Sequence, residues 1–166
     1  MGPINGYQVR RELVSWRLEE NTNVKPGSIY SAIRTLAKDG LIEGDPDWVL
    51  TGEGEKEFQM SLRESWWRLQ TPAEPLIPAL TMLPFMPRDE LVRALAARTA
   101  ALKSDLEALA FHRGQIKKGA TGADGGIPEH VREIVDFITA RRKSELEWTI
   151  KLQHKVRAGQ YWFEGE

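Results

Sequence analysis

Apolar side chains recur every three or four residues in several stretches of the chain, a pattern typical of helices that bury one face. Val9, Leu13 and Trp16 follow this spacing and predict a helix from Asn5 to about Arg17. The residues from Asn21 to Pro26 break the pattern and predict a turn.

A second helix is predicted over Gly27 to Lys38. Pro26 is tolerated at a helix start, Ser28 can satisfy an unpaired backbone amide there, and Asp39-Gly40 supplies a residue that accepts the positive φ of a helix end. Its expected buried face consists of Ile29, Ala32, Ile33 and Leu36.

Two short β-prone runs follow, at residues 41–43 and 48–50, separated by the turn-forming sequence GDPD. They predict a small hairpin. Thr51 can then cap a third helix, with Glu53 and Glu55 well placed against the helix dipole. This helix is expected to reach Trp66-Trp67 or Leu69.

Five prolines between residues 72 and 87 exclude one long helix there, although residues 76–83 are apolar enough for a short one. From Arg88 the spacing predicts a helix that packs lengthwise on another helix. Residues 119–126, GATGADGG, form a flexible connection, and helical spacing resumes from Ile127 to about Arg157. The apolar positions of the first of these helices are Val92, Leu95, Thr99, Leu102, Leu106 and Leu109.

The order helix, turn, helix, short hairpin, helix is that of a winged helix-turn-helix domain. We therefore predict a mainly α fold with a small β-hairpin wing. The expected domains are a winged helix-turn-helix at residues 1–70, a proline-rich connection at 71–87 and a two-helix region at 88–166.

The second helix has a polar face without acidic residues. A carboxylate there would be repelled by phosphates, whereas small hydroxyls and flexible cations can approach phosphates and base edges. This face predicts contact with double-stranded DNA through Ser28, Ser31, Arg34, Thr35 and Lys38.

Overall charge adds little, because 23 basic and 24 acidic side chains nearly cancel. DNA binding would therefore depend on a local patch. The absence of cysteine excludes disulfides and thiolate chemistry, and no signal sequence or membrane-spanning apolar run is present. We expect a cytoplasmic protein that does not associate with membranes.

Four linked motifs resemble the PadR-like family of winged helix-turn-helix transcriptional regulators. They lie in GPINGYQV (2–9), PGSIYSAIRTLAKDGLIE (26–43) and WVLTGEGEKEF (48–58). Gly6-Tyr7 occupies the place where the family opens the first helix of the turn, and Gly27-Ser28-Ile29-Tyr30 opens the recognition helix. Gly40-Leu41-Ile42 leads into the wing, and Thr51-Gly52-Glu53-Gly54 follows it.

The likeness continues more weakly through LIPALTMLPFMPRDEL (76–91) and ELEW (145–148). The resemblance implies a repressor that binds operator DNA as a homodimer through its C-terminal helices, with release by a small-molecule effector. It also implies that Tyr30 contacts a phosphate. The residues expected in the dimer interface are Val92, Leu95, Leu102, Leu106, Leu109, Ile134, Ile138 and Leu152.

Two features depart from the family pattern. Family members have a helix before the glycine-proline pair found here as Gly2-Pro3, so either the stated start lies downstream of the true one or other helices cover the exposed surface. The wing tip, Asp45-Pro46-Asp47, is acidic where family wings carry cations. These features favour an alternative, a winged-helix protein-interaction module that does not bind DNA.

Other chemistry has weaker support. Trp66, Trp67 and Trp148 could line a pocket for a small aromatic effector, although core or dimer packing is the usual role of aromatics at helical spacing. The histidines do not cluster, and His130 with Glu133 reads as an exposed pair, so we expect no metal site. No catalytic motif or cofactor-binding loop occurs, and we expect no enzyme activity.

Overall fold

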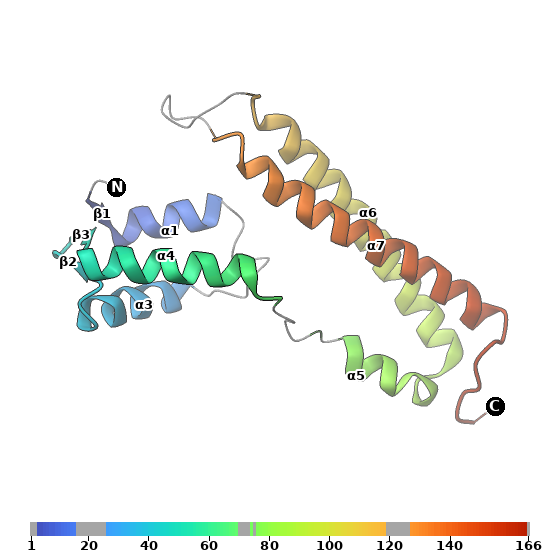
Figure 1. Ribbon diagram of the computed structural model, residues 1–166. Helices are drawn as coiled ribbons and strands as arrows, with labels where there is room; N and C mark the ends of the chain where they lie inside the picture. Colours follow the sequence, from blue (N-terminus) through green and yellow to red (C-terminus); the bar gives the residue numbers. More distant parts are fainter. Residues whose placement is uncertain (1–2, 16–25, 70–73, 75, 119–126, 166) are drawn as a thin grey trace. The chain divides into compact units, whose positions relative to one another are not determined.

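The computed structural model describes residues 3–15, 26–69, 74, 76–118 and 127–165. They form two compact units, which divide the chain between residues 73 and 74 (Figure 1). The predicted turn at 21–25, the end of the first predicted helix and the glycine-rich connection lie outside the described residues.

The described residues of the first unit form three helices and a small antiparallel sheet (Figure 1). The strands lie in the order β1-β3-β2, with Ile4 opposite Trp48 and Ile42 opposite Leu50. The hairpin prediction is confirmed, and β1 is an additional strand. The bounds are β1 (Ile4–Asn5), α1 (Gly6–Ser15), α3 (Pro26–Lys38), β2 (Ile42–Glu43), β3 (Asp47–Leu50) and α4 (Gly52–Trp67).

Helix α1 begins with a reciprocal cap. The Asn5 side chain accepts a hydrogen bond from the Gln8 amide at 3.0 Å, and the Gln8 side chain accepts one from the Asn5 amide at 2.9 Å. Two amides that the helix itself cannot pair are thereby satisfied, as in a capping box. This cap explains why the chain changes from strand to helix between these residues.

Glycine ends α3 and turns the chain toward the wing. Gly40 has a φ of +70°, its amide donates to Ala37 O, and the Leu41 amide donates to Leu36 O. This pair of bonds is a Schellman motif, which needs the left-handed backbone that glycine adopts without strain.

Thr51 joins the wing to α4. Its hydroxyl donates to Gly40 O at 2.7 Å and accepts from the Gly54 amide at 3.0 Å. A Cβ on Gly54 would lie 1.9 Å from Leu41 O, so only glycine allows α4 to approach the backbone between α3 and β2 this closely. The predicted cap is confirmed, and the Thr-x-x-Gly motif has a structural role.

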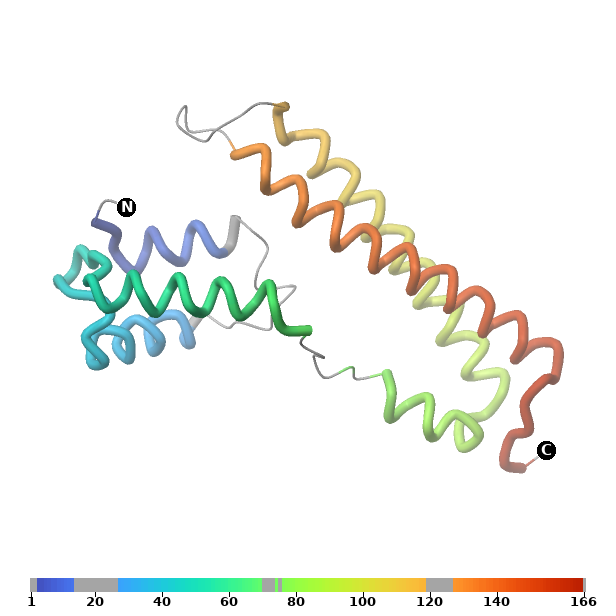
Figure 2. The backbone as a smooth tube through the Cα atoms, in the orientation of Figure 1, coloured from blue at the N-terminus to red at the C-terminus, as the bar shows by residue number. Residues whose placement is uncertain are grey.

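The second unit is a long antiparallel helix pair, with a short helix and a 3-10 turn at one end (Figures 1 and 2). The predicted lengthwise packing of α6 on α7 is confirmed. Buried Leu95, Leu102 and Leu109 follow the heptad spacing of α6. The bounds are α5 (Leu76–Thr81), the 3-10 turn η1 (Leu83–Phe85), α6 (Arg88–Gln115) and α7 (Val131–Arg157).

The main core of this unit lies where the segment after α7 returns to α6. Phe163 is 1% exposed and packs in a cluster with Leu95, Leu152 and Val156. Arg88 fixes the returning segment by donating to Val156 O at 2.8 Å and to Tyr161 O at 3.1 Å. Partly buried side chains around this core are Leu80, Leu83, Leu91, Val92 and Tyr161.

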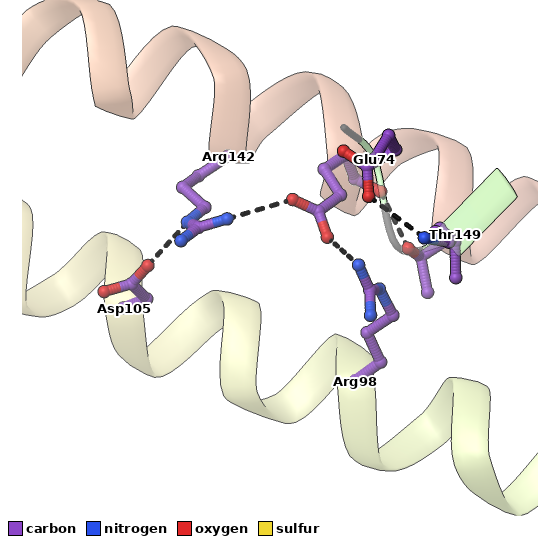
Figure 3. A network of polar contacts seen from close by, with 7 residues as sticks. Glu74, Arg98, Asp105, Arg142 and Thr149 are labelled. Carbon is purple, nitrogen blue, oxygen red and sulfur yellow. Dashed lines mark hydrogen bonds and ion pairs between the residues drawn. The ribbon is translucent and has the colours of Figure 1, made fainter. Parts of the chain in front are cut away.

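Ion pairs connect the two long helices along one side (Figure 3). Glu145 of α7 lies between Arg98 of α6 and Arg142, and Arg142 also donates to Asp105 of α6 at 2.7 Å. These side chains are only partly exposed, so solvent screens them less than free surface pairs. The network favours one register of α6 against α7.

No helix among the described residues is long and apolar enough to cross a membrane. The predicted fold class, mainly α with a small winged-helix sheet, is confirmed.

Candidate nucleic-acid interface

Helix α3 buries a narrower strip than its sequence predicts. Ile29 and Ile33, one turn apart, are buried, whereas Ala32 and Leu36 of the expected buried face are exposed, Leu36 to 39%. That part of the prediction is wrong. Periodicity identifies the side of a helix that is apolar, but the width of the buried strip depends on the neighbouring elements.

All six side chains expected to contact DNA are exposed on α3. Thr35 follows Ile33 by two residues and therefore lies about 200° around the helix from the buried strip. Ser31 lies one turn before Thr35 on the same outward surface. The six are Ser28, Tyr30, Ser31, Arg34, Thr35 and Lys38.

The outward surface of α3 has two different flanks. Arg34 and Lys38, one turn apart, form a cationic flank. Ala32 and Leu36, also one turn apart, form an apolar flank on the other side of Ser31 and Thr35. Because α3 carries two cations and no carboxylate, its surface is locally positive although the whole chain has a net charge of −1.

Tyr30 lies against the start of α1. A Cβ on Gly6 would be 2.9 Å from Tyr30 Cε1, so the glycine allows this close approach. Tyr30 as a whole is still 43% exposed. The Gly6-Tyr7 and Gly27-Tyr30 motifs are therefore linked, since the glycine of one accommodates the tyrosine of the other.

The wing has the opposite charge to α3. Glu43, Asp45 and Asp47 are all exposed, and Gly44 between them has a φ of +99°. Carboxylates close to a phosphate backbone weaken binding. The local geometry therefore presents α3, rather than the wing tip, as the surface suited to an anionic polymer.

Half of the residues expected at a dimer interface pack within one chain. Leu95, Leu102, Leu109 and Leu152 are buried in the second unit and have little surface left for another chain. Ile134 is exposed, and the remaining three, Val92, Leu106 and Ile138, are half-buried.

An exposed apolar stripe lies on α7, and the sequence reasoning missed its central residue, Phe137. Phe137 is 65% exposed, and Ile134 and Trp148 are also exposed. They fall at heptad spacing, three residues apart and then eleven, and Trp148 lies one turn before buried Leu152, so the stripe borders the buried side of α7. The heptad spacing that starts at Ile134 could also have found Phe137, three residues further on.

The three tryptophans of the expected effector pocket are not brought together in either unit. Trp66 and Trp67, at the end of α4, are 84% and 86% exposed within the first unit. Trp148 belongs to α7 in the second unit.

No group of three or more potential metal ligands gathers among the described residues. His130 precedes α7 and Glu133 lies in its first turn, and both are exposed.

No protein-family model and no curated protein matches the sequence of the chain. Solved structures do match its fold. Bacillus subtilis PadR in complex with operator DNA aligns over 93% of this chain and 90% of that chain, with a TM-score of 0.65 and 17% identity.

Two further structures give the same result. Bacillus subtilis PadR in complex with p-coumaric acid covers 94% of this chain and 92% of its own, with a TM-score of 0.68 and 16% identity. A PadR-like transcriptional regulator from Bacillus cereus covers 95% and 92%, with a TM-score of 0.64 and 15% identity. The resemblance in the sequence motifs is thus confirmed at the level of structure, and the chain has the fold of the PadR-like regulators.

Proposed function

We propose that this chain is a PadR-type transcriptional repressor that binds operator DNA as a homodimer. The observation that carries the proposal is the outward surface of α3, where six exposed residues include two cations and no carboxylate. The likeness to a PadR structure with operator DNA supports it. In this proposal Ser28, Tyr30, Ser31, Arg34, Thr35 and Lys38 contact DNA.

The cations and the small side chains of α3 have different roles in this proposal. Arg34 and Lys38 neutralise phosphates and fix the position of the helix, while the small side chains between the flanks let the backbone come close to the base edges. A symmetric dimer must hold its two α3 helices about one DNA turn, ~34 Å, apart for both to enter the major groove.

We place the dimer contact on the apolar stripe of α7, formed by Ile134, Phe137 and Trp148. An exposed stripe of large apolar side chains at heptad spacing is suited to pack on a second helix. Of the residues expected from sequence, Ile134, Ile138, Leu106 and Val92 keep exposed area and remain in the proposed interface.

An effector that changes the spacing of the two α3 helices would release the DNA. We propose a small aromatic acid, in keeping with the PadR structure that holds p-coumaric acid. Trp66, Trp67 and Trp148 are the candidate reporters. Titration of p-coumaric acid should quench tryptophan fluorescence and weaken operator binding. The absence of a response in both signals would exclude p-coumaric acid as the effector.

The acidic wing favours a second candidate, a protein-interaction module that does not bind DNA. Glu43, Asp45 and Asp47 would repel a phosphate backbone but suit a basic protein surface. Salt separates the two candidates, because a DNA reader loses affinity steeply as salt rises through counterion release.

The test is to select duplexes from random DNA with the full chain and to measure their affinity at several salt concentrations. A repressor of the proposed kind should select a sequence with two similar half-sites and show a steep salt slope. Failure to enrich any sequence would end the proposal and favour the interaction module.

A further inference from the structure

The hydroxyl of Thr35 is turned toward its own helix. Thr35 Oγ1 donates to Ser31 O at 3.1 Å, which uses the single proton of the hydroxyl. Within the described part of the chain, the Ser31 hydroxyl makes no comparable hydrogen bond. The two small residues at the centre of the outward surface therefore offer different groups: Ser31 a hydroxyl with its proton available, and Thr35 chiefly a methyl group.

This methyl group belongs to a continuous apolar patch. Ala32, three residues before Thr35, and Leu36, the next residue, are both exposed. Residues three or four apart on a helix are neighbours, so the Ala32 methyl lies beside both side chains. Arg34 and Lys38 form the cationic flank, and their contacts with phosphates would bring this patch against DNA.

The chemistry of the major groove identifies what such a patch can recognise. Among the four bases only thymine presents a methyl group there, and apolar contact by alanine or by a threonine methyl is a known way to read it. Phosphate contacts by Arg34 and Lys38 carry no sequence information. Discrimination between bases thus depends on the small residues beside the cationic flank.

We infer that Thr35, supported by Ala32, is a specificity-determining residue that reads the C5 methyl group of a thymine in each operator half-site. This inference rests on the proposed function. It assigns to Thr35 an apolar contact instead of a hydrogen bond, and it requires at least one essential thymine in each half-site.

The experiment uses the full chain and a duplex selected from random DNA, resynthesised with 2′-deoxyuridine in place of one thymidine at a time. Deoxyuridine pairs normally and lacks only the methyl group. At one symmetric pair of positions, a single deoxyuridine should lower the affinity about four-fold, the value for leaving one methyl group unburied. Deoxyuridine at both positions should lower it about sixteen-fold. Replacement of thymidines outside the half-sites is the control.

Two variants distinguish the methyl group of Thr35 from its hydroxyl as the contacting group. Thr35→Ser keeps the hydroxyl and lacks the methyl in both subunits, so it should bind the thymidine duplex about sixteen-fold more weakly and no longer distinguish deoxyuridine. Thr35→Val keeps a methyl group and lacks the hydroxyl, so it should retain the discrimination. Both changes are at an exposed position, and unchanged circular dichroism melting verifies that each variant is folded.

Equal affinity for every deoxyuridine duplex, or discrimination retained by Thr35→Ser and lost by Thr35→Val, would overturn the inference while leaving DNA binding intact. Absence of any DNA binding by the wild-type chain would instead remove the proposed function, and the inference with it.

Discussion

The guanidinium carbon of Arg88 lies 4.6 Å from the centre of the Phe163 ring, so the first residue of α6 holds the segment that follows α7. The same guanidinium donates to two backbone carbonyls, Val156 O and Tyr161 O. Cation–π attraction and charge-assisted hydrogen bonds therefore act at one point, beside the core of the second unit.

Arg88→Ala should destabilise the second unit, because both carbonyls lose a charged donor and Phe163 loses its cover. Together these contacts suggest a loss of ~2–4 kcal/mol in the free energy of unfolding. Urea unfolding followed by circular dichroism measures it. Arg93→Ala is the matched control, since Arg93 is exposed and pairs only with Asp89 among the described residues, and its loss should stay within ~0.5 kcal/mol. Equal stability of the two variants would contradict the proposed role of Arg88.

Gly54→Ala should disrupt the junction between the wing and α4. Its Cβ would meet Leu41 O at 1.9 Å, and because this atom belongs to the backbone it cannot move aside without shifting the end of α3. We expect a loss of about 3 kcal/mol, at the upper end for overpacking. Thermal unfolding should show it in the first unit.

Gly52→Ala provides the control for that prediction. A Cβ at Gly52 meets nothing within 4 Å, although both glycines lie in the first turn of α4. This variant should be as stable as the wild type or slightly more stable, by up to ~1 kcal/mol from helix propensity. If both alanine variants unfold at the same temperature, the close approach of Gly54 to Leu41 O does not explain why the motif needs this glycine.

Arg34→Ala should weaken operator binding by ~1–3 kcal/mol, the range for a good bidentate contact by arginine. Arg63→Ala removes another exposed cation, from α4, and should change affinity little. Gel-shift titrations at several salt concentrations test both variants. The phosphate contact proposed for Arg34 predicts a salt slope smaller by about one unit, and an unchanged slope would instead assign Arg34 to a base edge.

Replacing Phe137 with glutamate should dissociate the proposed dimer. A carboxylate in the middle of the apolar stripe would be buried without a partner, which strongly disfavours association. Light scattering should then report 18.9 kDa, the mass of one chain, instead of twice that value. Lys103→Glu, at an exposed position on α6, should leave the dimer intact. A dimer that persists in Phe137→Glu would place the interface elsewhere.

Acid should weaken the contact between α6 and α7 at Asp136. Hydrogen bonds from the Arg113 guanidinium, one of them 2.5 Å long, hold the pKa of Asp136 below its ordinary value of 3.8. The folded pKa is therefore lower than the unfolded one, so the stabilisation is complete above about pH 4 and is lost as the pH falls through the folded value.

Asp136→Asn should remove this part of the acid dependence. Urea midpoints measured between about pH 5 and pH 2 would then fall less steeply than in the wild type. Arg113→Gln should have the same effect, and the double variant should add nothing further. Identical pH profiles for all four proteins would exclude the pair as a contributor.

The long helices could be predicted from sequence because the patterns that identify them lie within short stretches of the chain. Leu95, Leu102 and Leu109 repeat every seven residues, and Thr51 has the side chain that a helix cap needs. Contacts between residues far apart in sequence gave no such signal. The pairing of Ile4 with Trp48 and the burial of Phe163 beside Leu95 depend on where the chain returns.

The candidate DNA surface was predicted only in part. Its polar side was visible because α3 lacks carboxylates, but Ala32 and Leu36 were assigned to the interior. Alanine and leucine on a helix indicate an apolar side without telling whether the protein or a ligand covers it. The apolar patch beside Thr35 therefore became visible only when the burial of each side chain was known.

The burial of Phe163 also has a consequence for how the protein is made. A ribosome releases the chain from its first residue onward, and the winged unit is complete by about residue 73. The helix pair cannot close its core until Phe163 has left the exit tunnel. During synthesis the nascent winged unit can therefore reach its native state while α6 and α7 still await the aromatic ring that completes their packing.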